Sequence, residues 1–182
     1  MPSCTFAEYI EQEKTEDSRH EYVSGYKFEM PEVSEEHHLI SRIIENLFSA
    51  KVRENSYQLH SFETPLWIEQ VAVCYYPDMM LIPSNEKTET RYKTNPNLII
   101  EIFSSRTQAT DRQEKFLNYQ LIPTLQEYLL ISEKEPKIEI HRKNEQGNWI
   151  SQTLKETDSL HIQTLNLTIS VEEIYQNSFI DD

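Results

Sequence analysis

The 182-residue chain is long enough for one domain with a complete hydrophobic core, and we expect a single domain over residues 1–182. Apolar residues make up 37% and charged residues 26% of the sequence, which is typical of a globular protein and not of a disordered one. The formal net charge of −14 argues against broad, non-specific binding of nucleic acid, which needs a basic surface. A local basic cleft remains compatible with this charge, and the acidic excess suits a protein that recruits divalent cations.

Cysteine, glycine and hydropathy patterns exclude further classes of protein. Cys4 and Cys74 are too few for a disulfide framework or a zinc site, so we expect reduced thiols in a cytoplasmic protein. The N-terminal segment is charged throughout, and no stretch approaches the roughly 20 apolar residues of a membrane span. With only two glycines, Gly25 and Gly147, the chain cannot form a glycine-rich phosphate loop.

Apolar periodicity and capping residues predict alternating helices and strands. In chain order we expect a helix over residues 5–14, two strands within 20–30, a longer helix from residue 34, extended segments at 57–69 and 72–82, a loop at 83–96, a strand at 97–103, a helix at 107–121, strands at 127–132, 137–143 and 149–154, and a short helix opened at residue 170. Thr5 with Glu8, and Ser170 with Glu173, are expected capping boxes. The order predicts an α/β (α+β) layer fold around one sheet.

A glutamate inside an apolar run is the first indication of a functional site. Glu101 lies within NLIIEIF, residues 97–103, where a charged side chain is almost never buried unless it has a partner. Asp78 follows Pro77 in the preceding extended segment, so neighbouring strands could bring the two carboxylates together. Mg²⁺ between them would relieve their repulsion, since it takes oxygen ligands and is often held by one or two carboxylates. In the alternative interpretation Asp78 only ends a strand and Glu101 pairs with an arginine.

The spacing of these acids fits the PD-(D/E)XK nuclease pattern, except for its lysine. That pattern places Lys two positions after the second acid, whereas Ile102 and Phe103 follow Glu101. The next predicted helix contains Asp111 and Lys115, and Lys115 could reach back toward Glu101 if this helix packs over the sheet. Alternatively, Asp111 and Lys115 form an ordinary i, i+4 ion pair on the helix surface.

The ordered set of motifs resembles the Uma-two family of restriction endonucleases, a branch of the PD-(D/E)XK nuclease superfamily. The motifs that carry the resemblance are FAEYI, HEYVSGYKFEM, SEEHHLISRIIENL, YYPDMMLI, NLIIEIFSSRT, DRQEKFLNY, IPTLQEYLLI and LNLTISVEEIY. The resemblance implies a restriction-endonuclease-like mixed central sheet flanked by helices. It also implies a Mg²⁺- or Mn²⁺-dependent endonuclease that hydrolyses DNA phosphodiester bonds, with Asp78 and Glu101 as metal ligands and Lys115 as the third catalytic residue. Residues 104–107 and 122–126 depart from the family pattern, which affects the shape of two loops.

Other residues are expected to have accessory roles. The resemblance makes Glu21 an acid near the metal, although a solvated strand residue fits equally well, and Asp111 accompanies Lys115. His38 is expected to face the cleft, whereas His37 is expected to cap the helix or lie on the surface. Ser104 either bonds to the site or, more simply, caps the following helix. Three basic residues near the acidic strand are interpreted as scattered surface charge rather than phosphate ligands: Arg91, Lys93 and Arg106.

Two rival functions remain at this point. The same fold could be a catalytically weak or inactive module that binds nucleic acid or protein, an interpretation that the acidic charge favours. The site could also hydrolyse RNA or a small molecule. The expected partners are a DNA substrate and, as the commonest oligomeric default, a second copy in a symmetric homodimer, with no membrane.

Overall fold

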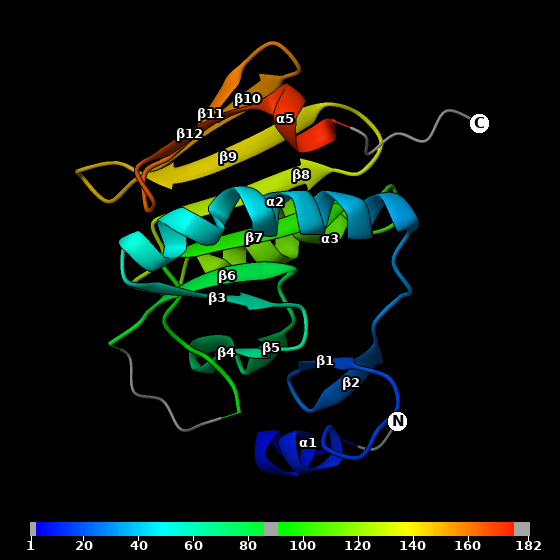
Figure 1. Ribbon diagram of the computed structural model, residues 1–182. Coiled ribbons are helices and arrows are strands. Elements are labelled where there is room, and N and C mark those ends of the chain that lie inside the picture. The colour runs from blue at the N-terminus through cyan, green and yellow to red at the C-terminus, as the bar shows by residue number, and fades with distance from the viewer. Residues whose placement is uncertain (1–2, 86–90, 177–182) are drawn as a thin grey trace.

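The computed structural model describes residues 3–85 and 91–176 of the chain (Figure 1). In this part of the chain the strands form a six-stranded, a four-stranded and a two-stranded sheet. The expectation of one sheet is therefore wrong. The reason lies at Pro77 and Asp78, which interrupt the extended segment, so that the strand before them joins the four-stranded sheet and the strand after them joins the six-stranded sheet.

The six-stranded sheet is mixed, as expected. Its order is β10 (Trp149–Lys155), β9 (Lys137–Lys143), β8 (Glu127–Ser132), β7 (Leu98–Phe103), β6 (Met79–Pro83) and β3 (Tyr57–Ser61). The pair β7 and β8 is parallel, and the other neighbours are antiparallel. The helix between β7 and β8 thus forms the crossover that a parallel pair requires.

The remaining strands form two smaller sheets. The four-stranded sheet has the order β2 (Tyr26–Glu29), β1 (His20–Val23), β5 (Val73–Tyr75) and β4 (Leu66–Ile68). The two-stranded sheet consists of β11 (Ser159–Ile162) and β12 (Leu167–Ser170), which the sequence pattern did not predict. The helical segments are α1 (Phe6–Gln12), α2 (Glu35–Glu54), η1 (Glu69–Val71), α3 (Gln108–Thr110), η2 (Asp111–Lys115), α4 (Phe116–Tyr119) and α5 (Val171–Tyr175).

The predicted caps are confirmed. Both capping boxes form, at the start of α1 and of α5. Ser34 caps the 20-residue α2 by accepting a hydrogen bond from the backbone N–H of His37 at 3.1 Å. These bonds satisfy backbone N–H groups that have no partner inside a helix.

The predicted helix after β7 is confirmed in place but not in form. It consists of α3, η2 and α4 in direct succession, and η2 is a π-helical turn. Such turns are rare and often lie at functional sites. Here the turn begins at Asp111 and ends at Lys115, both of which are buried.

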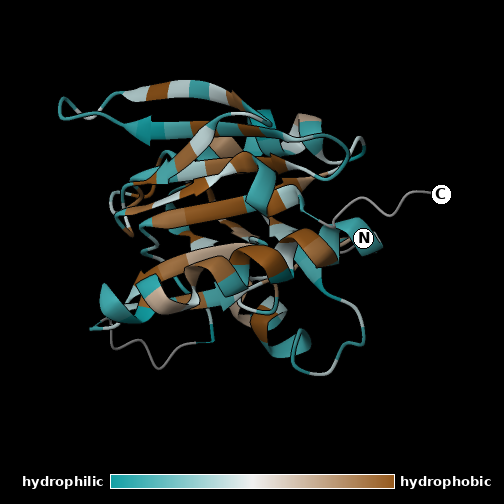
Figure 2. Cartoon of the chain, turned by 45° about the horizontal axis from the view of Figure 1, so that its top comes forward, coloured by the Kyte–Doolittle hydropathy of each residue, from teal (hydrophilic) through white to brown (hydrophobic). Residues whose placement is uncertain are grey.

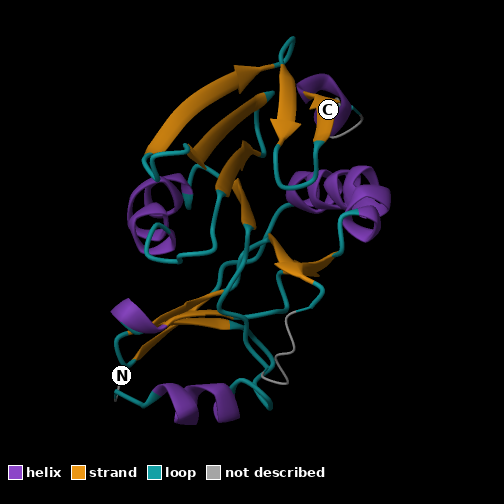
Figure 3. Ribbon diagram, turned by 90° about the vertical axis from the view of Figure 1, so that its left-hand side faces the viewer, coloured by secondary structure: helices purple, strands orange, loops and turns teal. Residues whose placement is uncertain are grey.

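The layers follow from alternation along the strands and from the apolar stripe of α2. Figure 3 shows α2 on one side of the six-stranded sheet and α3 with α4 on the other. In Figure 2 hydrophobic residues run along α2 and along the strands of this sheet. The core on the α2 side includes Ile40, Ile44 and Phe48, whereas the core on the other side includes Tyr119 and Tyr128. A third, smaller core joins α1 to the four-stranded sheet.

Alternation along β7 decides where Glu101 points. Ile100 and Ile102 belong to the core on the α2 side, and Ile99 and Phe103 belong to the opposite core. Since side chains alternate along a strand, Glu101 faces the same side as Ile99 and Phe103. The strand therefore directs this carboxylate toward the helical segment between β7 and β8. Within the described residues no helix is long and apolar enough to cross a membrane.

Candidate active site

A pocket of about 520 Å³ opens beside the ends of β6 and β7, the first hairpin and the start of α2. Of the residues expected at an active site, all but one line it: Glu21, Asp78, Glu101, Ser104, Asp111 and Lys115. The exception is His38. The lining also includes three further acids, Glu29, Glu32 and Glu133, and a second permanently charged base, Arg106.

Asp78 is held from two directions. Asp78 directly precedes β6, in which Met79 pairs with Ile100 of the antiparallel β7. Asp78 therefore lies across from Glu101. Its Oδ2 accepts a hydrogen bond of 2.6 Å from the backbone N–H of Ile102, and its Oδ1 lies 3.0 Å from His37 Nε2. The carboxylate is therefore fixed by β7 and by α2 together.

Glu101 is buried, with 3% of its surface exposed. Its Oε1 accepts hydrogen bonds from Tyr119 Oη at 2.7 Å and from Lys115 Nζ at 3.2 Å. Burial raises the pKa of Glu101 to about 8, because the charges of Asp78 and Asp111 add to the loss of water and outweigh the attraction of Lys115. The partner of this glutamate is thus a lysine and a tyrosine rather than the arginine of the alternative interpretation.

Lys115 connects three acidic residues. Its Nζ lies 3.1 Å from Glu21 Oε1, 3.2 Å from Glu101 Oε1 and 3.3 Å from Asp111 Oδ1. Burial lowers the pKa of Lys115, but the three carboxylates outweigh it and hold the pKa well above the ordinary value. The predicted i, i+4 ion pair with Asp111 exists, yet both side chains are buried, so it is not an ordinary surface pair.

The positions of the two adjacent histidines are the reverse of those expected. His37 is buried at the pocket, whereas His38 is exposed and does not line it. Burial lowers the pKa of His37, but the hydrogen bond and charge of Asp78 outweigh it, so the net pKa is raised. The spacing of α2 explains the difference, because His37, Ile40 and Ile44 follow one another at helical intervals along the buried face.

Ser104 shapes the turn that follows β7. Its Oγ accepts hydrogen bonds from the backbone N–H groups of Arg106 at 3.1 Å and Thr107 at 3.3 Å. Its own N–H donates to Thr107 Oγ1 at 3.2 Å. Ser104 therefore lines the pocket while it holds the chain in the turn that leads into α3.

Comparison with known proteins assigns the chain to a family. Residues 6–172 match the model of the family Uma2, described as "Putative restriction endonuclease".

The chain belongs to the Uma2 family.

Three similar proteins align with most of this Uma2 chain. The uncharacterized protein slr1290 of Synechocystis sp. is 28% identical over 97% of this chain and 93% of its own length. A second uncharacterized Synechocystis protein, sll1609, is 29% identical over 80% of this chain and 84% of its own length. A crystal structure from Anabaena variabilis, described as that of "a putative nuclease belonging to DUF820", superposes with a TM-score of 0.75 at 15% identity, over 94% of this chain and 98% of that one. This last likeness shows that the fold is shared.

The donor set of the Uma2 pocket fits a hard divalent cation. Glu21, Asp78, Glu101 and Asp111 line it with Lys115, so the acidic groups outnumber the buried base. Burial is the main reason for the raised pKa of Glu101, and the neighbouring charges of Asp78 and Asp111 raise it further. Carboxylate oxygens are the ligands that Mg²⁺ and Mn²⁺ favour, and Mg²⁺ retains several waters when few protein ligands are present. Asp78 and Glu101 are the two acids at the strand ends that would hold it.

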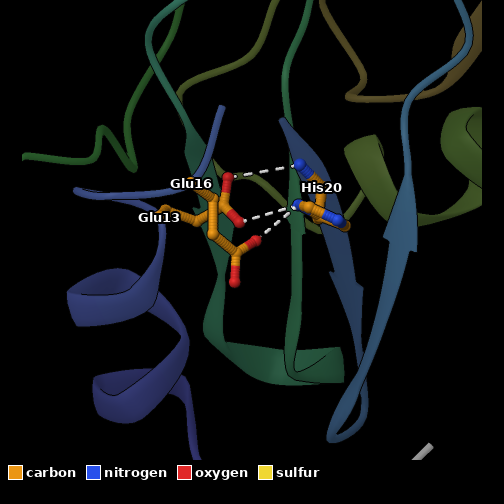
Figure 4. A group of neighbouring side chains, drawn as sticks. All are labelled: Glu13, Glu16 and His20. Atoms are coloured by element: carbon orange, nitrogen blue, oxygen red, sulfur yellow. Dashed lines mark hydrogen bonds and ion pairs between the residues drawn. The ribbon is translucent and has the colours of Figure 1, made fainter. Parts of the chain in front are cut away.

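A second group of ligating side chains lies outside this pocket. Glu13, Glu16 and His20 have donor atoms that all lie within 4.8 Å of one another, and Figure 4 shows the two carboxylates directed toward the histidine. Lys27 Nζ, however, lies 2.5 Å from Glu16 Oε1 and 3.5 Å from Glu13 Oε1. Because the ammonium group of Lys27 already supplies positive charge there, this group is accounted for as an ion-pair cluster that ties β1 and β2 to the segment after α1.

The pKa of Glu101 predicts how the stability of the metal-free protein depends on pH. Between the ordinary pKa of 4.5 and the folded value of about 8, Glu101 is ionised in the unfolded chain but protonated in the folded one. The folded state then binds more protons, so this residue lowers the free energy of unfolding as the pH rises through that window. Glu101→Gln has no proton to lose and should gain stability relative to the parent across it.

Urea unfolding in chelator, at about pH 5 and about pH 8, measures this effect. We expect Glu101→Gln to be at least as stable as the parent at the higher pH, with a smaller advantage at the lower pH. Glu156→Gln, at an exposed site, is the matched control and should follow the parent at both. An equal pH dependence in the parent and in Glu101→Gln would show that Glu101 is ionised throughout.

Proposed function

We propose that this Uma2 chain is a metal-dependent endonuclease that hydrolyses DNA phosphodiester bonds, with Mg²⁺ or Mn²⁺ bound by Asp78 and Glu101. The observation that carries the proposal is the convergence of Asp78, Glu101 and Lys115 on one pocket from three separate elements. The family description and the nuclease described for Anabaena variabilis support a nuclease as the class of activity.

Each residue has a role that its contacts support. The bound cation would supply Lewis-acid chemistry, neutralising charge on the phosphate and lowering the pKa of water. Asp78, fixed by Ile102 and His37, holds its side of the site rigid. In the reaction a water oxygen bonds to phosphorus and one ester P–O bond breaks, which leaves a phosphate end and a hydroxyl end.

Lys115 is placed to stabilise the charge that develops on the phosphate. Its ammonium group has three donor hydrogens and lies against three carboxylates, at Glu21, Glu101 and Asp111. Contact with a phosphate oxygen replaces one of these partners, so the lysine is already oriented before the substrate arrives. Preorganised donors of this kind are among the largest contributions to enzymatic rate.

One observation favours a second candidate function. Seven acidic side chains line the pocket, against the permanently charged bases Lys115 and Arg106. A lining so acidic would bind a polyanion weakly in the absence of metal, as expected for a module that recognises a basic protein segment instead. The two functions differ in whether the metal-loaded protein breaks a phosphodiester bond.

A substrate panel separates the two candidates. The purified protein with Mn²⁺ should nick or cut end-labelled duplex DNA or single-stranded DNA, and chelator should stop the reaction. RNA of the same sequence is included to define the sugar preference. If the protein binds Mn²⁺ but leaves every DNA and RNA substrate intact, the nuclease proposal is wrong and the binding module is supported.

A further inference from the structure

Arg106 differs from Lys115, which also lines the pocket, and from the nearby Arg112, because it has no acidic partner among the residues that the structure describes. Lys115 is surrounded by three carboxylates. Arg112 is bound to Glu139 with an N–O distance of 2.6 Å, and its guanidinium also lies 4.6 Å from the ring centre of Phe103. Among the described residues Arg106 makes neither an ion pair nor a side-chain hydrogen bond, although it lines a pocket rich in acids. A guanidinium left unpaired in a chain with 31 acidic and 17 basic residues is available for an external anion.

The backbone N–H groups around Arg106 cannot bind the anion in place of the guanidinium. Ser104 Oγ accepts hydrogen bonds from the N–H groups of Arg106 and Thr107, so neither N–H can bind an anion without breaking the turn. The same bonds hold the turn together with the Ser104 N–H bond to Thr107 Oγ1. The exposed Arg106 side chain therefore extends from an internally braced turn at the edge of the pocket.

The acidic lining limits how many phosphates can be bound. Glu29, Glu32 and Glu133 line the pocket together with the acids around Lys115. A phosphate beside these carboxylates would be repelled, whereas one at Arg106 would be attracted and could be bound by two parallel N–H···O bonds. Apart from the scissile phosphate at the cation and Lys115, the charge pattern therefore supports one anchored phosphate rather than a row of contacts along a duplex.

We propose that Arg106 anchors a phosphate of the nucleic-acid strand at the edge of the pocket, as a single contact that positions the strand and takes no part in bond breaking. This inference rests on the proposed nuclease function, and it names the residue that recognises the substrate. It replaces the interpretation of Arg106 as scattered surface charge. It also explains how a strongly acidic chain can accept a polyanion: the scissile phosphate meets the cation and Lys115, a second phosphate is bound by Arg106, and the remaining acids exclude further phosphates.

Binding can be tested separately from cleavage. A fluorescent 12-nucleotide single-stranded DNA is titrated with protein in Ca²⁺, which fills sites for divalent cations, and anisotropy is followed at several NaCl concentrations. Arg106→Gln should weaken binding by about 10-fold or more, and the slope of log K against log salt should become shallower by about 0.7, the value for one phosphate contact on a single strand. Arg106→Lys, which keeps the charge but not the paired donors, should fall between the parent and Arg106→Gln.

Arg53→Gln is the matched control, because Arg53 is an exposed arginine in the last turn of α2, at the end remote from the Ser34 cap. It should bind within about two-fold of the parent with an unchanged salt slope. In cleavage assays Arg106→Gln should raise KM and leave kcat within a few-fold, as expected when an interaction is equally strong in the ground state and the transition state.

The outcomes separate this proposal from the nuclease function. If the parent cleaves DNA but Arg106→Gln binds the oligonucleotide as the parent does, the anchor is wrong and the nuclease stands. If the parent binds through Arg106 with the expected salt slope but cleaves nothing, the anchor stands and the nuclease is wrong. If the parent does not bind the oligonucleotide, or if Arg53→Gln loses as much affinity as Arg106→Gln, the anchor is wrong.

Discussion

Asp78→Asn should abolish binding of Mn²⁺ at the pocket and reduce DNA cleavage by a factor of about 10³ or more, because the several kcal/mol that a bound cation supplies to the transition state would be lost. The substitution keeps the shape of the side chain and an oxygen that can still accept the hydrogen bond from the Ile102 N–H. We therefore expect the variant to fold, since what it loses is the negative charge. Calorimetric titration with Mn²⁺ and a cleavage time course measure the two effects.

Asp17→Asn is the control for this experiment. Asp17 is exposed and does not line the pocket, so the same chemical change there should leave metal binding and cleavage unaltered. A Mn²⁺ isotherm that is unchanged in Asp78→Asn would show that the cation binds elsewhere and that Asp78 is not a metal ligand.

Lys115→Met should reduce kcat by about 10²–10³-fold while Mn²⁺ still binds, which is the loss seen when one preorganised donor to a developing charge is removed. Burial makes this variant costly in stability as well, because Glu21, Glu101 and Asp111 lose their shared cation. Breaking a buried ion pair in this way costs about 3–5 kcal/mol. Cleavage is therefore measured with saturating metal at a temperature where circular dichroism shows the variant to be folded.

Asp111→Asn separates a catalytic lysine from a purely structural one. This variant removes one of the three carboxylates at Lys115 and keeps the ammonium group, so kcat should fall far less than in Lys115→Met. If the two variants lose similar stability and both retain full kcat, the role of Lys115 is purely structural. The lysine of the nuclease pattern would then be absent from this chain.

The pattern of the central strands could be recognised because these strands of the larger sheet are buried on both faces. In β7 and β8 every residue is buried, and their predicted limits agree with the observed strands to within a residue. The hairpin of β11 and β12 was missed although Leu160 and Ile162 are buried and alternate with exposed residues. Four residues of alternation are too few to distinguish a strand from a loop without knowledge of the surface that they cover.

The site was partly readable for a similar reason. A glutamate in a buried strand requires a partner, and the next helix offers Lys115, which the structure places 3.2 Å from Glu101. The π-helical turn could not be predicted, because it adjusts the direction of Asp111 and Lys115 without changing the sequence pattern of a helix. The contact of Glu21 with Lys115 depends on how the four-stranded sheet sits against the larger sheet, which local patterns do not encode.

The central claim is that Asp78 and Glu101 hold a divalent cation in this pocket. Crystals soaked in Mn²⁺ and measured at a wavelength where manganese scatters anomalously locate the ion directly. We expect an anomalous peak about 2.0–2.2 Å from a carboxylate oxygen of each of the two residues. A peak at Glu13, Glu16 and His20 with none in the pocket, or a pocket without manganese at saturating concentration, would contradict it.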